Sequence, residues 1–302
     1  MGRIQSPHDT FFRGILADKE VASDYFKAYL PTFVTEKLDF DTLVQTGESY
    51  ISKQLKESFS DVVFTCKLKE GERQVKVSLL IEHKSYIDKY TPIQLGSYIF
   101  SGLQKQLDNR EKLSIIIPIL FYHGEERWEY KDLSGLFNNP DPDWDQYVPN
   151  FSYVYNNLWE MSDEQLEALS NQFLTASLLT LKHFKQNTWL EENATKIFIK
   201  TRDVPENLLE LLIVYFLQIN KSDEPKFIEI FESIPEALKD KIMSTYDMLI
   251  EKGEKRGFEK GFEKAQAEYV KNMLLKGFAE EVICDTLGVK SEFVKTIAET
   301  LK

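Results

Sequence analysis

Residues 113–124, LSIIIPILFYHG, form a nearly unbroken apolar run of strand length, and this segment narrows the choice of fold more than any other. Such a run is typical of a strand that is buried on both faces of its sheet. Two β-rich segments precede it, SDVVFTCKL at 60–68 and VKVSLLIEHKS at 75–85, and the turn KEGERQ between them predicts a hairpin. Helical spacing returns over 93–107. The order of these segments predicts an α/β core.

The flanking segments complete this core. Apolar residues recur at three- and four-residue intervals in DTFFRGILADKEVASDYFKAYLP, so the first fifty residues are expected to be helical, with Pro31 as a stop signal. FSYVYN at 151–156 is expected to be the last strand. Beyond residue 160 the spacing is helical, and Ser162 followed by Gln165 predicts a capping box. An all-α region is therefore expected at 162–250.

Three parts are predicted: a core at 1–160, a helical region at 161–250 and a charged tail at 251–302. The tail begins with GEKRGFEKGFEK, which repeats glycine every four residues. Each glycine costs a helix about 1 kcal/mol relative to alanine, so the repeat predicts either a helix of charge pairs or a flexible connector. The segment 279–301 is predicted to be a helical hairpin with its turn at Gly288. With few basic residues, it favours packing or homodimer formation over reading DNA.

Composition excludes several classes of protein. No stretch approaches the roughly 18 apolar residues of a membrane span, and no signal-peptide core is present, so a cytoplasmic protein without membrane contact is expected. Two distant cysteines and four dispersed histidines give no zinc spacing. The net charge of −12 argues against a nucleic-acid partner on average. Residues 51–112, however, hold eleven Lys or Arg against eight Asp or Glu, whereas the tail has ten of each.

One group of residues is a candidate for metal binding and catalysis. Asp61 opens the first strand of the predicted hairpin, and Glu82 and Lys84 end the second, on one face by alternation. Two carboxylates at strand ends suit Mg²⁺ or Mn²⁺, with the carbonyl of His83 as a further oxygen ligand. Lys84 would orient the attacking water or stabilise charge on a phosphate. The alternative is a strand that simply reaches the surface and turns polar.

The other histidines are expected to be structural. The side chain of His83 should point away from Glu82 and Lys84 and be packed or hydrogen bonded. His8 follows Pro7 at a helix entry, and His123 ends the buried strand. His183 lies in an amphipathic helix and has no partner evident in the sequence.

Five segments carry a resemblance to a known family. The chain resembles the recombination-promoting nucleases, also called putative transposases, which belong to the PD-(D/E)XK nuclease superfamily. The similarity is strong over residues 1–160 and looser in the tail. The segments that carry it, in order and at similar spacing, are SPHDTFF (6–12), SDVVF (60–64), LLIEHKS (79–85), QLGSY (94–98) and IPILFYHG (117–124).

The resemblance implies a restriction-endonuclease-like core, a mixed sheet flanked by helices, and a metal-dependent DNA endonuclease. Asp61 and Glu82 match the metal-binding acids, Lys84 the motif lysine, and Gln94 the glutamine on the following helix. Asp9 resembles a family position close to the active site, and Ser60 replaces the proline of the superfamily's name. The alternative is a catalytically silent nuclease-fold protein that binds a partner, or its own copy, through the helical tail. A retroviral-integrase-type transposase would need three acids on a different framework.

Overall fold

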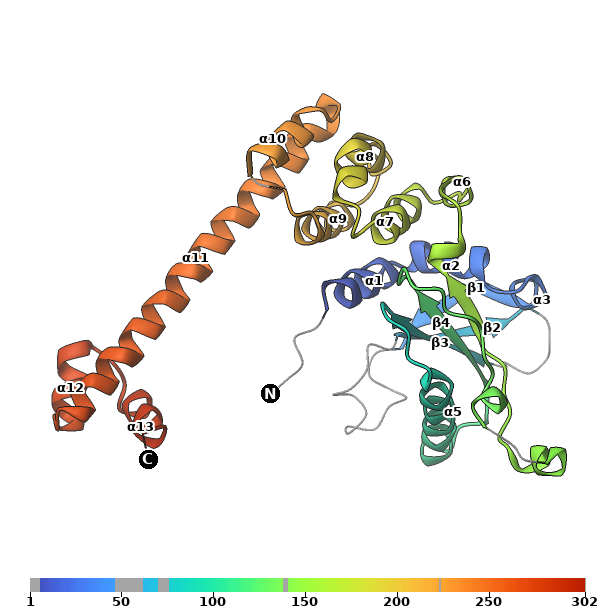
Figure 1. Cartoon of the computed structure of the whole chain (residues 1–302), viewed down its shortest axis with the longest axis horizontal. Helices are drawn as coiled ribbons and strands as arrows, with labels where there is room; N and C mark the ends of the chain where they lie inside the picture. Colours follow the sequence, from blue (N-terminus) through green and yellow to red (C-terminus); the bar gives the residue numbers. More distant parts are fainter. Residues whose placement is uncertain (1–5, 47–61, 70–75, 138–140, 223, 302) are drawn as a thin grey trace. The chain divides into compact units, whose positions relative to one another are not determined.

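A five-stranded mixed sheet of order β1-β2-β3-β4-β5 lies at the centre of the first part of the chain (Figure 1). The computed structural model describes residues 6–46, 62–69, 76–137, 141–222 and 224–301. The first three strands are antiparallel neighbours, whereas β4 runs parallel to β3 and β5 parallel to β4. The predicted hairpin and the predicted buried strand are thereby confirmed. The strands are β1 (Leu38–Gln45), β2 (Val62–Leu68), β3 (Lys76–Lys84), β4 (Ile115–Tyr122) and β5 (Val154–Asn157).

Helices cover both faces of the sheet. On one face lie α1 (Pro7–Ala17) and α2 (Lys19–Tyr29), where the ring of Phe12 stacks on Phe121 of β4 at 4.4 Å between centroids. On the other face lies α5 (Thr91–Asp108), whose Tyr98 packs in one buried cluster with Leu120. Figure 1 shows these helices on opposite sides of the strands. Alternate residues of β3 and β4 therefore meet different helices.

The helical expectation for the first fifty residues is wrong at 38–45, which form strand β1. Leu38, Phe40 and Leu43 are buried, while the residues between them are polar and partly or fully exposed. Only one face of β1 is buried, so this strand needs few apolar residues and gives a weak periodic signal. The predicted first helix is also divided. The side chain of Asp18 accepts hydrogen bonds from the backbone of Glu20 and Val21 and caps α2.

A helical layer follows the sheet and packs back on α1. The rings of Phe11 and Tyr215 stack at 3.8 Å between centroids, and Gly14 permits close approach because a Cβ there would lie 2.7 Å from Leu211. The capping box of Ser162 and Gln165 is confirmed at α6. The remaining elements of this layer and of the preceding loops are α3 (Thr32–Thr35), η1 (Ser134–Leu136), η2 (Pro142–Tyr147), η3 (Leu158–Glu160), α6 (Asp163–Glu167), α7 (Gln172–Lys182), α8 (Asn187–Ile199), α9 (Glu206–Ile219) and α10 (Glu224–Glu232).

The chain separates into two compact units, Met1–Ile242 and Met243–Lys302. The long helix α11 (Glu236–Leu275) includes the glycine repeat, which is helical rather than a flexible connector. The predicted terminal hairpin is α12 (Glu280–Leu287) and α13 (Ser291–Glu299), and its turn residue Gly288 has φ +62°. Buried Val270, Ile283 and Val294 join the hairpin to the end of α11. The division at residues 160 and 250 stays a prediction. Across the described ranges, no helix combines the length and apolarity required for crossing a bilayer.

Candidate active site at the end of β3

The interior strand β3 ends in two of the charged residues predicted for the site. Glu82 pairs with Leu120, which faces α5, so Glu82 and Lys84 lie on the α5 face of the sheet. Both are buried, with exposed fractions of 2% and 6%. The ammonium Nζ of Lys84 lies 3.0 Å from Oε1 of Glu82. A buried carboxylate and ammonium each cost several kcal/mol to desolvate, so their pairing is what permits both to be inside.

Asp88 joins this pair from the loop that follows β3. Its Oδ2 lies 3.6 Å from Nζ of Lys84, and its Oδ1 accepts a hydrogen bond from the backbone of Tyr90, just before α5. Asp88 is absent from the residues predicted above. Four-residue spacing brings side chains together on a helix, whereas Lys84 ends a strand and Asp88 lies in the loop after it, so no local pattern indicated this contact. The described cluster therefore holds two carboxylates and one ammonium.

One oxygen of this cluster has no partner among the described residues. Oε2 of Glu82 is buried and accepts no hydrogen bond from any residue that the structure describes. A buried unpaired carboxylate oxygen is costly, and a hard cation would satisfy it. Asp61, the other predicted acid, lies outside the described residues. Within the described ranges, no three His, Cys, Asp or Glu side chains form a group that could hold a metal ion.

The electrostatics of the cluster keep Lys84 charged. Burial opposes the ammonium form, but the charge and the hydrogen bond of Glu82 outweigh it and raise the pKa of Lys84, with a smaller contribution from Asp88. Lys84 can therefore stabilise negative charge or orient a water molecule at neutral pH. It cannot accept a proton there as a general base.

The opposite face of β3 carries His83. Its Nδ1 lies 2.7 Å from Oδ1 of Asp9 in α1, and its ring stacks against Phe12 and His123, with centroids 4.8 and 4.5 Å away. Burial raises the pKa of Asp9, but the hydrogen bond and the charge of His83 outweigh burial and lower it. The expected packed and hydrogen-bonded state of the His83 side chain is confirmed. Asp9 thus meets His83 and not the Glu82–Lys84 pair.

Three of the four histidines gather on this face. The backbone N–H and Nδ1 of His123 both lie 3.1 Å from the carbonyl oxygen of Lys84, and since a carbonyl only accepts, Nδ1 carries the proton. Burial, followed by the charges of His83 and His8, lowers the pKa of His123 well below its usual value. His8 extends the group, with its ring 5.0 Å from His123 and its Nδ1 2.7 Å from the hydroxyl of Tyr215. Neutral His123 therefore fixes the end of β4 to the backbone of Lys84.

The buried histidines are expected to make the stability of the fold sensitive to acid. Burial, reinforced by His83 and Lys185 and opposed by Asp9, lowers the pKa of His8 from 6.5 to about 4. Between these values the unfolded chain binds a proton that the folded chain does not, so stability falls as pH drops from 6.5 towards 4. We expect the melting temperature to fall less between pH 7 and pH 4.5 in His8→Asn than in wild type. Equal losses in the two proteins would contradict this role for His8.

Gln94 lies in the first turn of α5. Its Oε1 is buried and accepts no hydrogen bond from the part of the chain that the structure describes. Tyr98, one turn later, is buried against the sheet. The structure therefore puts Gln94 on the helix that covers the Glu82–Lys84 face but joins it to neither residue.

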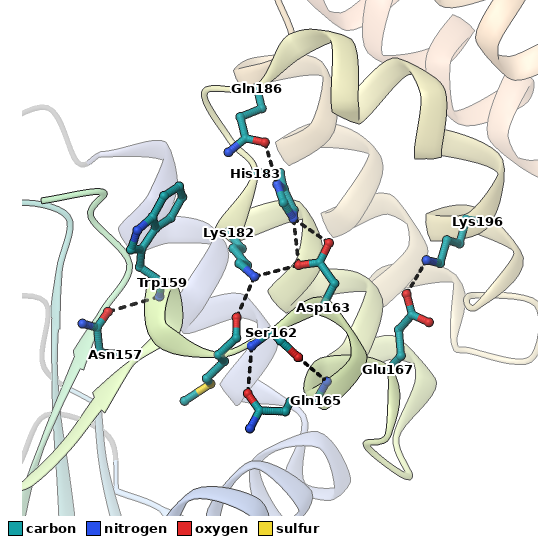
Figure 2. Close-up of polar contacts among 11 residues, drawn as sticks. Asn157, Trp159, Ser162, Asp163, Gln165, Glu167, Lys182, His183, Gln186 and Lys196 are labelled. Atoms are coloured by element: carbon teal, nitrogen blue, oxygen red, sulfur yellow. Dashed lines mark hydrogen bonds and ion pairs between the residues drawn. The ribbon is translucent and has the colours of Figure 1, made fainter. Parts of the chain in front are cut away.

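A second polar cluster lies between α6 and α7 (Figure 2). Nε2 of His183 is 3.0 Å from both carboxylate oxygens of Asp163, and Nδ1 is 2.9 Å from Oε1 of Gln186. Lys182 donates to Asp163 and to the carbonyl of Met161. Burial opposes ionisation of Asp163, but the hydrogen bonds from Lys182 and His183 lower its pKa. His183 thus has hydrogen-bond partners that the sequence did not indicate. The hydrogen bonds of Asp163 with Lys182 and His183 join α6 to the end of α7.

Comparison with known proteins gives a family. A family model described as "Putative transposase, YhgA-like" matches residues 6–210. A protein of Escherichia coli (strain K12) named inactive recombination-promoting nuclease-like protein RpnE is 24% identical over 289 residues, which cover 93% of this chain and 94% of that protein. Recombination-promoting nuclease RpnD of Escherichia coli O157:H7 is 26% identical over 234 residues, covering 76% and 87%. Recombination-promoting nuclease RpnA of strain K12 is 29% identical over 189 residues, covering 62% and 63%. No solved structure matches the chain.

The matched region contains the whole sheet and every residue predicted for the site. It covers about two thirds of the chain and includes the Glu82–Lys84 pair and the histidine group behind it. The chain belongs to the family described as "putative transposase, YhgA-like", with relatives named recombination-promoting nucleases.

Proposed function

We propose that this protein is a Mg²⁺-dependent DNA endonuclease that hydrolyses phosphodiester bonds and promotes recombination, with a core of the PD-(D/E)XK type. The observation that carries the proposal is the buried Glu82–Lys84 pair at the end of an interior strand, where one oxygen of Glu82 has no partner in the described part of the chain. The relatives named recombination-promoting nucleases support the same class of reaction. Mn²⁺ would substitute for Mg²⁺, since both prefer oxygen ligands.

The donor set fits a hard divalent cation. Glu82 offers a buried carboxylate oxygen to which no described residue donates a hydrogen bond, and the carbonyl of His83 is the proposed second donor on the same strand. Asp61 is the proposed second acid; it directly precedes Val62, which pairs with Ile81, the neighbour of Glu82. When bound, Mg²⁺ would supply Lewis-acid polarisation of a phosphoryl oxygen.

Three further residues have proposed roles in the reaction. The Lys84 ammonium would stabilise the negative charge that develops on the phosphate or orient the attacking water, as its raised pKa permits. Gln94 would orient the site through its buried amide oxygen Oε1. Asp9 would act through His83, whose ring it holds from the other face of the sheet.

Cleavage of supercoiled plasmid DNA tests this proposal. We expect wild-type protein to nick or linearise the plasmid with Mg²⁺ or Mn²⁺ and to show no cleavage in EDTA. Asp61→Ala should abolish cleavage while the far-ultraviolet circular dichroism and the melting temperature stay close to wild type. Asp143→Ala, the same change at an exposed acid in η2, is the matched control and should cut normally. Full activity in Asp61→Ala would refute the assignment.

A second function has one specific observation in its favour. The relative that matches 93% of this chain is named inactive. In that reading the protein keeps a nuclease scaffold and binds a partner, or a second copy of itself, through its helical tail. Exposed Phe258 and Phe262 on α11 are the residues that such contact would use. Against it, the Glu82–Lys84 pair is intact.

Metal binding separates the two functions. Isothermal titration with Mg²⁺ or Mn²⁺ should show a site that Glu82→Gln weakens if the nuclease proposal is right. Absence of binding in wild type, together with a dimer in sedimentation that Phe258→Ser dissociates, would favour the scaffold reading instead.

A further inference from the structure

An exposed aromatic patch borders the candidate active site. The loop after β3 and the first turn of α5 expose four large apolar side chains within eight consecutive positions, Tyr86, Ile87, Tyr90 and Ile93, which we call the loop patch. Tyr86 is 57% exposed and Tyr90 54%. Isolated exposed apolar residues are ordinary, but a group of this kind beside a charged site marks a surface that binds something.

The ammonium group of a lysine lies over the ring of each tyrosine in the loop patch. The ammonium of Lys84, the proposed catalytic lysine, lies over the ring of Tyr86 at 5.5 Å from its centroid. The ammonium of Lys89 lies over the ring of Tyr90 at 4.8 Å. A cation over a ring leaves the opposite ring face for another flat group, and the exposed fractions of both tyrosines leave room for one. A ring beside an ammonium is the combination that a nucleotide needs, since the base stacks and the phosphate is neutralised.

We propose that Tyr86 and Tyr90 stack the unpaired bases of single-stranded DNA and that exposed Lys89 contacts a flanking phosphate, while Lys84 keeps its proposed role at the reacting phosphate. This inference rests on the proposed function and adds its substrate class: DNA with unpaired nucleotides at the site. In a duplex each base already stacks on its neighbours, so its face is closed to a protein side chain.

The charges of the loop patch favour a nucleic acid over a protein partner. The net charge of the chain is −12, so the exposed ammonium of Lys89 over the ring of Tyr90 is a local exception to an acidic surface. A protein interface would bury the apolar residues and leave exposed Lys89 at its rim without a specified role. A strand of DNA uses the rings and the lysines together.

Fluorescence anisotropy in EDTA, which prevents cleavage, tests this without relying on catalysis. The probes are a 20-nucleotide single strand, its perfect duplex, and the same single strand with abasic sites at its centre. We expect wild type to prefer the normal single strand over both other probes. Tyr86→Leu should weaken binding to the normal single strand about tenfold, leave the duplex unchanged and erase the preference over the abasic strand. Tyr86→Trp should retain wild-type affinity.

Controls separate the possible failures. Tyr147→Leu, the same change at an exposed tyrosine in η2, should bind like wild type, and Tyr90→Leu should repeat the effect of Tyr86→Leu if the latter is poorly folded. Equal loss of single-strand and duplex affinity in Tyr86→Leu would overturn the inference, as would a dimer that this change dissociates without altering DNA binding. Mg²⁺-dependent cutting of perfect duplex without single-strand preference would overturn it and leave the proposed nuclease intact. Preferential single-strand binding without cutting would refute the nuclease alone.

Discussion

Glu82→Gln is expected to lower the rate of Mg²⁺-dependent DNA cleavage by about 10³-fold, because a Lewis-acid contribution of several kcal/mol depends on its carboxylate. Glutamine keeps the shape of the side chain and an oxygen that can accept from Lys84. The ammonium also keeps Asp88 as a charged partner, so the fold should persist. What it removes is the negative charge that would hold the cation. The measurement is the rate of plasmid nicking at several Mg²⁺ concentrations.

The control for this variant is an exposed glutamate changed in the same way. Glu192→Gln on α8 should cut at the wild-type rate, since this residue lies on the helix surface in the layer that follows the sheet. Partial recovery of Glu82→Gln at high Mn²⁺ would agree with a weakened metal site. Wild-type rates at low Mg²⁺ would show that Glu82 holds no catalytic metal, and the proposed function would then fail.

Local patterns in the sequence predicted the elements that position this site. Strand alternation alone puts Glu82 and Lys84 on one face and His83 on the other, and the structure has that arrangement. The apolar run before His123 predicted an interior strand for the same kind of reason, since a strand covered on both faces has no polar face. The turn at Gly288 follows from its left-handed backbone, which glycine adopts without strain.

Contacts between distant segments were not predictable in this way. Asp9 and His83 are separated by 74 positions, and nothing in the spacing of either segment indicates that they meet. The same holds for His8 and Tyr215, which tertiary packing of α1 on α9 brings together. Strand β1 escaped prediction because one covered face requires only a few apolar residues. The strand that bears the site could thus be predicted from its local sequence, whereas the side chains around it are brought there by tertiary packing.

Lys84→Met is expected to lower the free energy of unfolding by about 3–5 kcal/mol, the usual effect of removing one partner from a buried ion pair. Methionine fills a similar volume, so the loss reports charge and not a cavity. Without the ammonium, Glu82 would be a buried carboxylate with no compensating charge, and Asp88 would add a second negative charge nearby. The measurement is urea unfolding at pH 7, followed by circular dichroism.

A double variant shows whether the cost comes from the pair. In Glu82→Gln/Lys84→Met both charges are gone, and replacement of a whole buried pair is often neutral, so most of the lost stability should return. Both proteins should be inactive, because each lacks a group that the proposed reaction requires. Stability and activity would then separate: the double variant would be folded and silent, whereas Lys84→Met alone would be unstable and silent. If the double variant were as unstable as Lys84→Met, the stability of this strand end would depend on the lysine chain itself, and the site would not be held together by the Glu82–Lys84 pair.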